Sequence, residues 1–133
     1  MRGSVPMTVF TNFHPTALYA GDFPRATRPI TIATGANQAG APLKRGTVLG
    51  RVAASDKYVP CVKTATDGSQ VPDAILLHEV DASTADQGAK AYFTGEYAGE
   101  VMIFDASWTI ATLEAAFRQA KVSIFVKSVG TVA

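Results

Sequence analysis

Residues 43–52 read LKRGTVLGRV, and this stretch decides between two kinds of fold. A phosphate-binding loop of the ATPase type needs glycine, four residues and then Gly-Lys-Ser/Thr, so that backbone amides and a lysine surround the phosphates. The nearest match, GAPLKRGT at residues 40–47, has five residues between its glycines and no lysine after the second. The alternating residues that follow are typical of a strand and not of a helix. The stretch therefore predicts a turn at residues 44–46 and a strand over residues 47–53, with a bulge or a close backbone contact at Gly50.

Further runs rich in β-branched and aromatic residues indicate that most of the chain is β-structure. The predicted strands span residues 30–34, 47–53, 58–63, 73–80, 90–95, 100–104 and 122–127. Pro60 confines its strand to an edge or a bulge, because proline cannot donate to a β-ladder. The sequence TDGSQ at residues 66–70 predicts a turn, and the glycines of residues 95–99 predict another.

One helix is predicted, over residues 109–120 (TIATLEAAFRQA). Ile110, Leu113 and Phe117 recur at helical spacing and form a narrow apolar stripe that would pack on the sheets. Thr109 is a suitable N-cap, and Arg118 suits the negative end of the helix dipole.

The first 29 residues differ from the rest because they contain four prolines and no sustained periodicity. We therefore expect an extended N-terminal arm over residues 1–29, followed by a compact, mainly β (α+β) domain of barrel type over residues 30–133. Within the arm, residues 7–13 alternate briefly, with Val9, Thr11 and Phe13 on one side and Phe10 on the other. This segment is able to add to the edge of a sheet as a strand.

The composition restricts the partners. The net charge is +1, from 12 basic and 11 acidic residues, so no strong field attracts nucleic acid or an anionic membrane. Apolar runs are too short for a signal peptide or a membrane span, and we expect neither targeting nor anchoring. Charged residues make up 17% of the chain, below the typical quarter, so we expect other subunits to cover part of the surface. The single cysteine excludes an internal disulfide and favours assembly in the cytosol.

Few residues are candidates for catalysis. A site built from Cys61, His78 and a carboxylate, Asp73 or Glu79, is conceivable because such triads assemble in space. The simpler interpretation makes Cys61 a small apolar strand residue. The two histidines, His14 and His78, have no metal-ligand spacing. We therefore expect no catalytic, cofactor or metal site and no small-molecule substrate. The aromatic residues lack an accompanying basic stripe and are assigned to core and interface packing.

The order of the motifs resembles a known family. The segments are PITIATG, KRGTVLGRV, YVPCV, DGSQVPDAILLHEVDA, KAYFTGEYAGEVMIF, and the late helix followed by VSIFV. Together they resemble the head decoration proteins of tailed bacteriophages. The resemblance implies a structural protein without a catalytic centre, which assembles in the host cytoplasm and becomes part of the virion. It implies a homotrimer that binds the major capsid protein on the outer surface of an expanded head, at three-fold and quasi-three-fold positions, and stabilises it.

The arm is longer than in the smallest members of that family, and we expect it to contact the capsid. The candidate capsid-binding residues are Val9, Phe10, Thr11, Phe13 and His14. Two alternatives remain open: a small β-barrel module that binds a ligand or peptide, which would contain a closed apolar pocket, and an enzyme that depends on Cys61.

Overall fold

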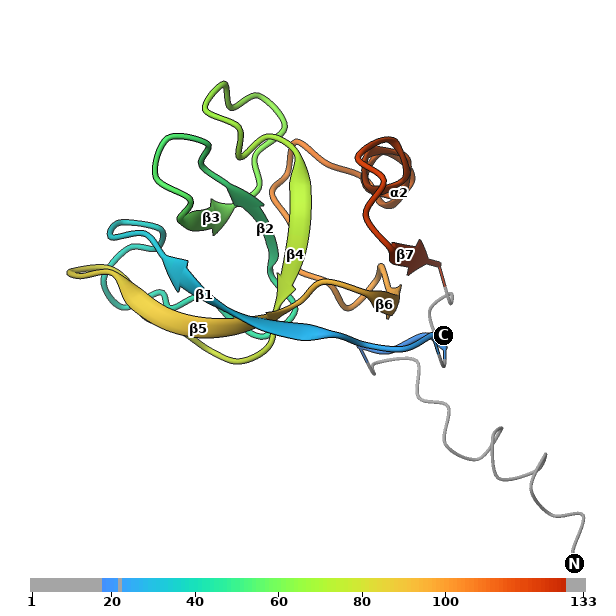
Figure 1. Cartoon of the computed structure of the whole chain (residues 1–133), viewed down its shortest axis with the longest axis horizontal. Coiled ribbons are helices and arrows are strands. Elements are labelled where there is room, and N and C mark those ends of the chain that lie inside the picture. Colours follow the sequence, from blue (N-terminus) through green and yellow to red (C-terminus); the bar gives the residue numbers. More distant parts are fainter. Residues whose placement is uncertain (1–17, 22, 129–133) are drawn as a thin grey trace, which may run out of the picture.

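A computed structural model describes residues 18–21 and 23–128. This part of the chain is mainly β, with a closed five-stranded barrel, a separate two-stranded sheet and one α-helix late in the sequence (Figure 1). The predicted fold class is confirmed. The strand predicted for residues 7–13 lies outside the described residues.

The barrel strands follow the order β1-β3-β2-β4-β5, and β5 pairs with β1 to close it. They are β1 (Thr27–Ile32), β2 (Val48–Arg51), β3 (Tyr58–Pro60), β4 (Pro72–Leu76) and β5 (Gln87–Tyr92). The β1–β5 ladder is antiparallel and runs the whole length of both strands. The parallel β1–β3 pairing, by contrast, contains one register pair, Ile32 with Tyr58. The prediction that Pro60 confines its strand to an edge or a bulge is wrong, because β3 lies between β1 and β2 in the closed barrel. Pro60 is tolerated there because it pairs only with Leu49 of β2 and not with β1.

The turn and the irregularity predicted for residues 44–53 are both present. Gly46 has a positive φ of 94°, which glycine adopts without strain, and the Thr47 amide donates to the Lys44 carbonyl at 3.2 Å. The register of β2 against β4 shifts between Leu49 and Gly50. A Cβ atom at Gly50 would lie 2.0 Å from the backbone oxygen of Ser69. Gly50 therefore combines a bulge with a close approach of another backbone segment.

The barrel wall separates two hydrophobic clusters, because neighbouring residues of a strand point to opposite faces. Val48 and Ile75 belong to the outer cluster, whereas Leu49 and Leu76 belong to the inner one. The inner cluster consists of residues from the barrel and its loops: Ile32, Leu43, Leu49, Tyr58, Ala74, Leu76, Val80, Ala82, Ala89 and Ala91. The outer cluster joins the barrel wall to the late helix and the small sheet: Leu18, Val48, Cys61, Ile75, Tyr92, Tyr97, Met102, Trp108, Leu113, Phe117, Ile124 and Val126.

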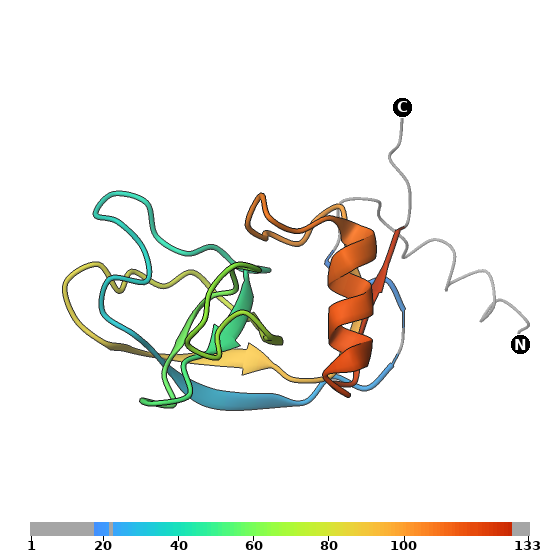
Figure 2. The same ribbon diagram turned by 90° about the horizontal axis from the view of Figure 1, so that it is seen from above.

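The late helix α2 (Ile110–Gln119) begins as predicted. The Thr109 side chain accepts from the Thr112 amide, and Thr112 bonds back to the Thr109 amide, which completes a capping box. Leu113 and Phe117 are fully buried. Figure 2 shows α2 standing beside the barrel with β7 (Ile124–Lys127) behind it.

Two predictions about residues 95–104 are wrong. The predicted turn at residues 95–99 is instead strand β6 (Gly95–Ala98), which pairs in parallel with β7. The predicted strand at residues 100–104 is a turn followed by one isolated bridge, between Ile103 and Thr47. The apolar residues of this segment pack without forming a β-ladder. Only Ile103 contacts the chain just before β2, where the Ile103 amide donates to the Gly46 carbonyl.

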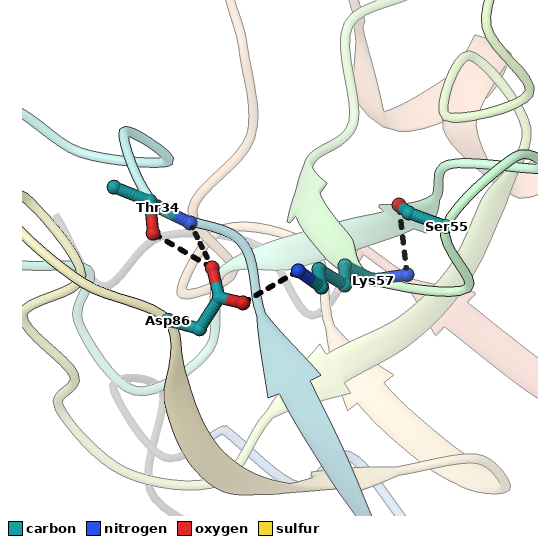
Figure 3. A network of polar contacts seen from close by, with 4 residues as sticks. All are labelled: Thr34, Ser55, Lys57 and Asp86. Atoms are coloured by element: carbon teal, nitrogen blue, oxygen red, sulfur yellow. Dashed lines mark hydrogen bonds and ion pairs between the residues drawn. The ribbon is translucent and has the colours of Figure 1, made fainter.

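The end of the barrel near the β1–β3 seam is held by a polar network (Figure 3). Asp86 accepts from the amide and the hydroxyl of Thr34, at 2.8 and 2.7 Å. Its second oxygen pairs with Lys57 Nζ at 2.5 Å. The ammonium of Lys57 and the Thr34 donors lower the pKa of Asp86 to about 2. The Asp86 carboxylate, just before β5, thus links the segment that follows β1 to the segment that precedes β3.

Candidate functional site

The first described residues attach to the small sheet. The Ala98 amide donates to the Leu18 carbonyl at 2.7 Å, and the Ala20 amide donates to the Glu96 carbonyl at 3.0 Å. Tyr19 forms an antiparallel bridge with Tyr97, and Leu18 is buried in the outer cluster. The small sheet therefore fixes the point at which the preceding 17 residues join the domain.

A cluster of tyrosines and arginines secures this attachment. The Tyr19 ring packs edge-on against Tyr92, with centroids 5.7 Å apart, and the two hydroxyl groups are hydrogen-bonded. Arg45 donates to the Tyr19 hydroxyl at 2.9 Å, while the Arg25 guanidinium lies 3.8 Å from the Tyr19 ring centroid. Burial and the hydrogen bond from Tyr19 raise the pKa of Tyr92, so its phenol stays protonated at neutral pH. These contacts hold Tyr19, and with it the start of the described chain, against the barrel.

The same end of the molecule exposes two aromatic rings. Phe23 and Phe125 pack edge to face, with ring centroids 5.0 Å apart, yet they remain 37% and 44% exposed. Paired aromatic residues left in water are typical of surfaces that other proteins cover. Figure 1 shows β6, β7 and α2 together at this end of the molecule.

Two further large apolar side chains are exposed elsewhere. Ile103 is 42% exposed and lines a groove of about 330 Å³ beside Pro60 and Phe104. Val71 is 46% exposed and lines a groove of about 480 Å³ beside α2 and Trp108. The uncovered apolar surface is thus distributed over several faces of the domain.

The predicted capsid-binding residues are not part of the described structure. Val9, Phe10, Thr11, Phe13 and His14 all lie outside the described residues, so their role stays a prediction. The tyrosine–arginine cluster was missed, because the aromatic residues were assigned to packing. That assignment is confirmed for Tyr92, Tyr97 and Trp108, which are buried. The sequence signal for the cluster is weak, because Tyr19 is one of four aromatic residues among the prolines of residues 1–29.

The candidate nucleophile is buried in this structure. Cys61 is 1% exposed, and burial raises the pKa of its thiol to about 12, so it carries no thiolate at neutral pH. The prediction that His78 lies in a strand is wrong, since β4 ends at Leu76 and His78 lies on an exposed bend. Asp73 accepts from the Tyr58 hydroxyl at 3.0 Å, and the side chain of Glu79 is exposed. Within residues 18–21 and 23–128, no hydrogen bond joins Cys61 to any of these groups.

The described residues were compared with the requirements of a metal site, a membrane-spanning helix and an internal ligand cavity. Across this part of the chain no three His, Cys, Asp or Glu side chains are grouped so that they could hold a metal ion. None of its helices is long and apolar enough to cross a membrane. The barrel interior is filled by side chains such as Leu49, Leu76 and Ala91, all fully buried. The described residues therefore form a small β-barrel domain with a filled interior and with large apolar side chains exposed on its outer surface.

The comparison with protein families identifies the group. The family model described as bacteriophage lambda head decoration protein D matches residues 12–124. The chain therefore belongs to the head decoration protein family, as its motifs suggested, and is a structural protein located on the capsid of a phage virion. No individually curated protein is similar enough to count as a match.

Proposed function

We propose that this protein is a capsid cement that binds the expanded head as a homotrimer, at three-fold and quasi-three-fold positions on its outer surface, and stabilises the shell. Its partner there is the major capsid protein, and assembly takes place in the host cytoplasm. The observation that carries the proposal is the family match over residues 12–124. The exposed Phe23, Val71, Ile103 and Phe125 support it, because a trimer bound to a shell has both subunit and capsid interfaces to cover them.

The N-terminal arm is the proposed contact with the shell. Residues 7–13 add to a sheet of the capsid protein as a strand and bury Val9, Phe10 and Phe13, while Thr11 and His14 contact its surface. Ordering seven backbone residues costs about 7–14 kcal/mol. Burial of three such side chains contributes about 4–9 kcal/mol, and six net hydrogen bonds contribute about 3–9 kcal/mol. A single arm is therefore close to break-even.

Trimerisation makes such weak arms effective. Once one arm of a trimer is bound, the second and third bind at the high effective concentration set by the shared scaffold. The root of each arm is also fixed, because Leu18 and Tyr19 are held against β6 and the barrel. Both features reduce the entropy that is lost when the second and third arms bind. Decoration is therefore expected to be tight and cooperative.

Removal of residues 1–13 tests the proposal. The truncated protein should keep the melting temperature of the full chain, since the described core begins at Leu18, but its binding to expanded capsids should weaken sharply. Phe10→Ala should weaken binding in part, whereas Thr8→Ala, in the same segment, serves as the matched control. Truncated protein that decorates capsids with unchanged affinity would exclude the arm from the interface.

Light scattering coupled to size-exclusion chromatography, together with images of decorated capsids, tests the trimer. A trimer on the shell is expected, whether or not the free protein is already trimeric. A monomer both in solution and on the capsid would contradict the proposal.

A further inference from the structure

Two arginines converge on the ring of Tyr19, at the root of the arm. The guanidinium carbon of Arg25 lies 3.8 Å from the centroid of this ring, and that of Arg45 lies 5.3 Å from it. Arg45 also donates to the Tyr19 hydroxyl at 2.9 Å. Both arginines are exposed. Two like charges are therefore held close together on one part of the surface, where they repel each other.

Neither arginine has a carboxylate partner among the described residues. The ion pairs within this part of the chain involve other cations. Glu96, on the strand that holds the arm root, pairs with Lys127 at 2.7 Å. A guanidinium group has five N–H donors, so the phenol oxygen of Tyr19 leaves most donors of Arg45 available. Arg25 and Arg45 therefore have the charge and the donors to bind a carboxylate from another protein.

The backbone segments that carry the two arginines are already ordered in this structure. The Thr94 hydroxyl donates to the carbonyl of the residue before Arg25 at 2.7 Å and accepts from the amide of the residue after it at 2.8 Å. Beside Arg45, the Gly46 amide donates to the Leu76 carbonyl at 2.9 Å. Because these segments are ordered beforehand, a partner that binds the guanidinium groups loses little chain entropy.

The position of the arginine pair selects the capsid as the partner. Residues 1–46 contain five basic residues and one acidic residue, whereas the whole chain has a net charge of +1. Positive charge is thus concentrated in the part of the chain that includes the arm. With residues 7–13 on the shell, as proposed above, the five residues that lead from Phe13 to Leu18 span at most about 18 Å. Tyr19 and its two arginines therefore lie close to the shell.

We propose that Arg25 and Arg45 together bind a carboxylate side chain of the major capsid protein, and that this contact fixes the arm root on the shell. The inference rests on the proposed function and adds a charged contact to the apolar one made by residues 7–13. A carboxylate has two oxygens and accepts from two guanidinium groups at once. Its negative charge also offsets the repulsion between the two arginines, which a neutral acceptor would not do.

Arg25→Gln and Arg45→Gln test this contact. Each substitution removes one charge and keeps a hydrogen-bond donor, and each should weaken binding to expanded capsids by at least about fivefold. Arg28→Gln is the matched control, because Arg28 is also exposed and stacks on a different ring, that of Phe93, at 5.2 Å. Equal effects of all three substitutions would overturn the proposal, because binding would then depend on overall charge alone.

Melting temperatures separate a binding role from a structural one. Each of the three variants loses one contact between a guanidinium group and an aromatic ring, so their melting temperatures should be similar. The capsid affinity should nevertheless fall only for Arg25→Gln and Arg45→Gln. A loss of melting temperature that parallels the loss of affinity, and is absent from Arg28→Gln, would overturn the proposal, because the arginines would then only hold Tyr19 in place.

Carbodiimide coupling identifies the source of the carboxylate. The Arg25→Lys protein keeps the positive charge and provides an amine, which carbodiimide joins to a carboxylate in direct contact. Mass spectrometry of decorated capsids should find residue 25 joined to an aspartate or glutamate of the major capsid protein. Coupling only to this chain or to a second copy of it, or no coupling, would overturn the proposal. Wild-type protein that does not decorate capsids would refute the proposed function as well.

Discussion

Gly50→Ala probes the element on which the barrel depends. At this position β2 bulges against β4, and the new methyl group would stand 2.0 Å from the Ser69 oxygen and 2.7 Å from the Ser69 carbonyl carbon. Ordinary carbon–oxygen contacts are about 3.3 Å or longer. Because the obstructing atoms are backbone, no side-chain rotation relieves the clash. The segment around Ser69 must therefore move by more than 1 Å, or β2 must.

The magnitude follows from this geometry. Overpacking of a well-packed site costs about 1–3 kcal/mol, and a backbone clash belongs at the upper end. The loss of chain entropy in the unfolded state returns about 0.4–1 kcal/mol for a glycine-to-alanine change. The net destabilisation is therefore about 2 kcal/mol. With a urea m-value of about 1–3 kcal/mol/M, the unfolding midpoint should fall by roughly 0.7–2 M.

Urea unfolding followed by the fluorescence of Trp108, the single tryptophan of the chain, measures this change. Gly88→Ala is the matched control, because a Cβ atom at Gly88 of β5 meets nothing within 4 Å. At Gly88 the substitution changes only the chain entropy of the unfolded state, so the stability of the control should be unchanged or slightly higher. A Gly50→Ala protein within about 0.5 kcal/mol of wild type, the usual range for harmless substitutions, would refute the argument that the Ser69 backbone requires glycine.

Three further predictions concern single side chains. Cys61→Ala should leave capsid binding intact, and thiol reagents should modify wild-type protein only in denaturant; a decoration defect in folded Cys61→Ala protein would contradict this. Asp86→Asn should lower the melting temperature at neutral pH, because the folded-state pKa of about 2 lies below the ordinary 3.8. The stabilising contribution is present above pH 3.8 and disappears as the pH falls towards 2, so a difference between the two proteins that persists at pH 2 would count against the network. Thr109→Ala should destabilise the protein by about 1 kcal/mol through the lost N-cap, measured by urea unfolding, and no loss would show that the cap of α2 is dispensable.

The local parts of the fold were predictable from sequence because local chemistry determines them. Thr109 and the spacing of Leu113 and Phe117 define α2 without reference to the rest of the chain. Gly46 and Gly50 defined a turn and a bulge, since few other residues adopt those conformations or leave that space. In such segments the pattern and the tertiary structure require the same residues.

The errors occurred where pairing is non-local. Gly95, whose φ of 137° suits glycine alone, makes the sequence of β6 look like a turn. The strand that pairs with β6 is β7, which lies far along the sequence. Residues 100–104 have the composition of a strand, yet no neighbouring strand is free to pair with them beyond Ile103. The same limit applies to the candidate site: neither the attachment of Tyr19 to Arg45 and Tyr92 nor the contact of Phe23 with Phe125 is visible in any one segment.

The positions of these features imply that stability and binding are separable in this protein. Gly50 and Asp86 lie in the barrel and at its seam, where they support the inner cluster and the closure of the wall. The arm root and Phe125 lie at the other end, on a sheet joined to the barrel through the outer cluster. We therefore expect Gly50→Ala to lower the free energy of unfolding while folded protein still decorates capsids, and Phe10→Ala to lower capsid affinity at unchanged stability. A variant series measured for both properties would show no correlation between them if this division holds. A strong correlation would instead mean that capsid binding requires the barrel itself, and that the surface responsible for decoration includes its wall.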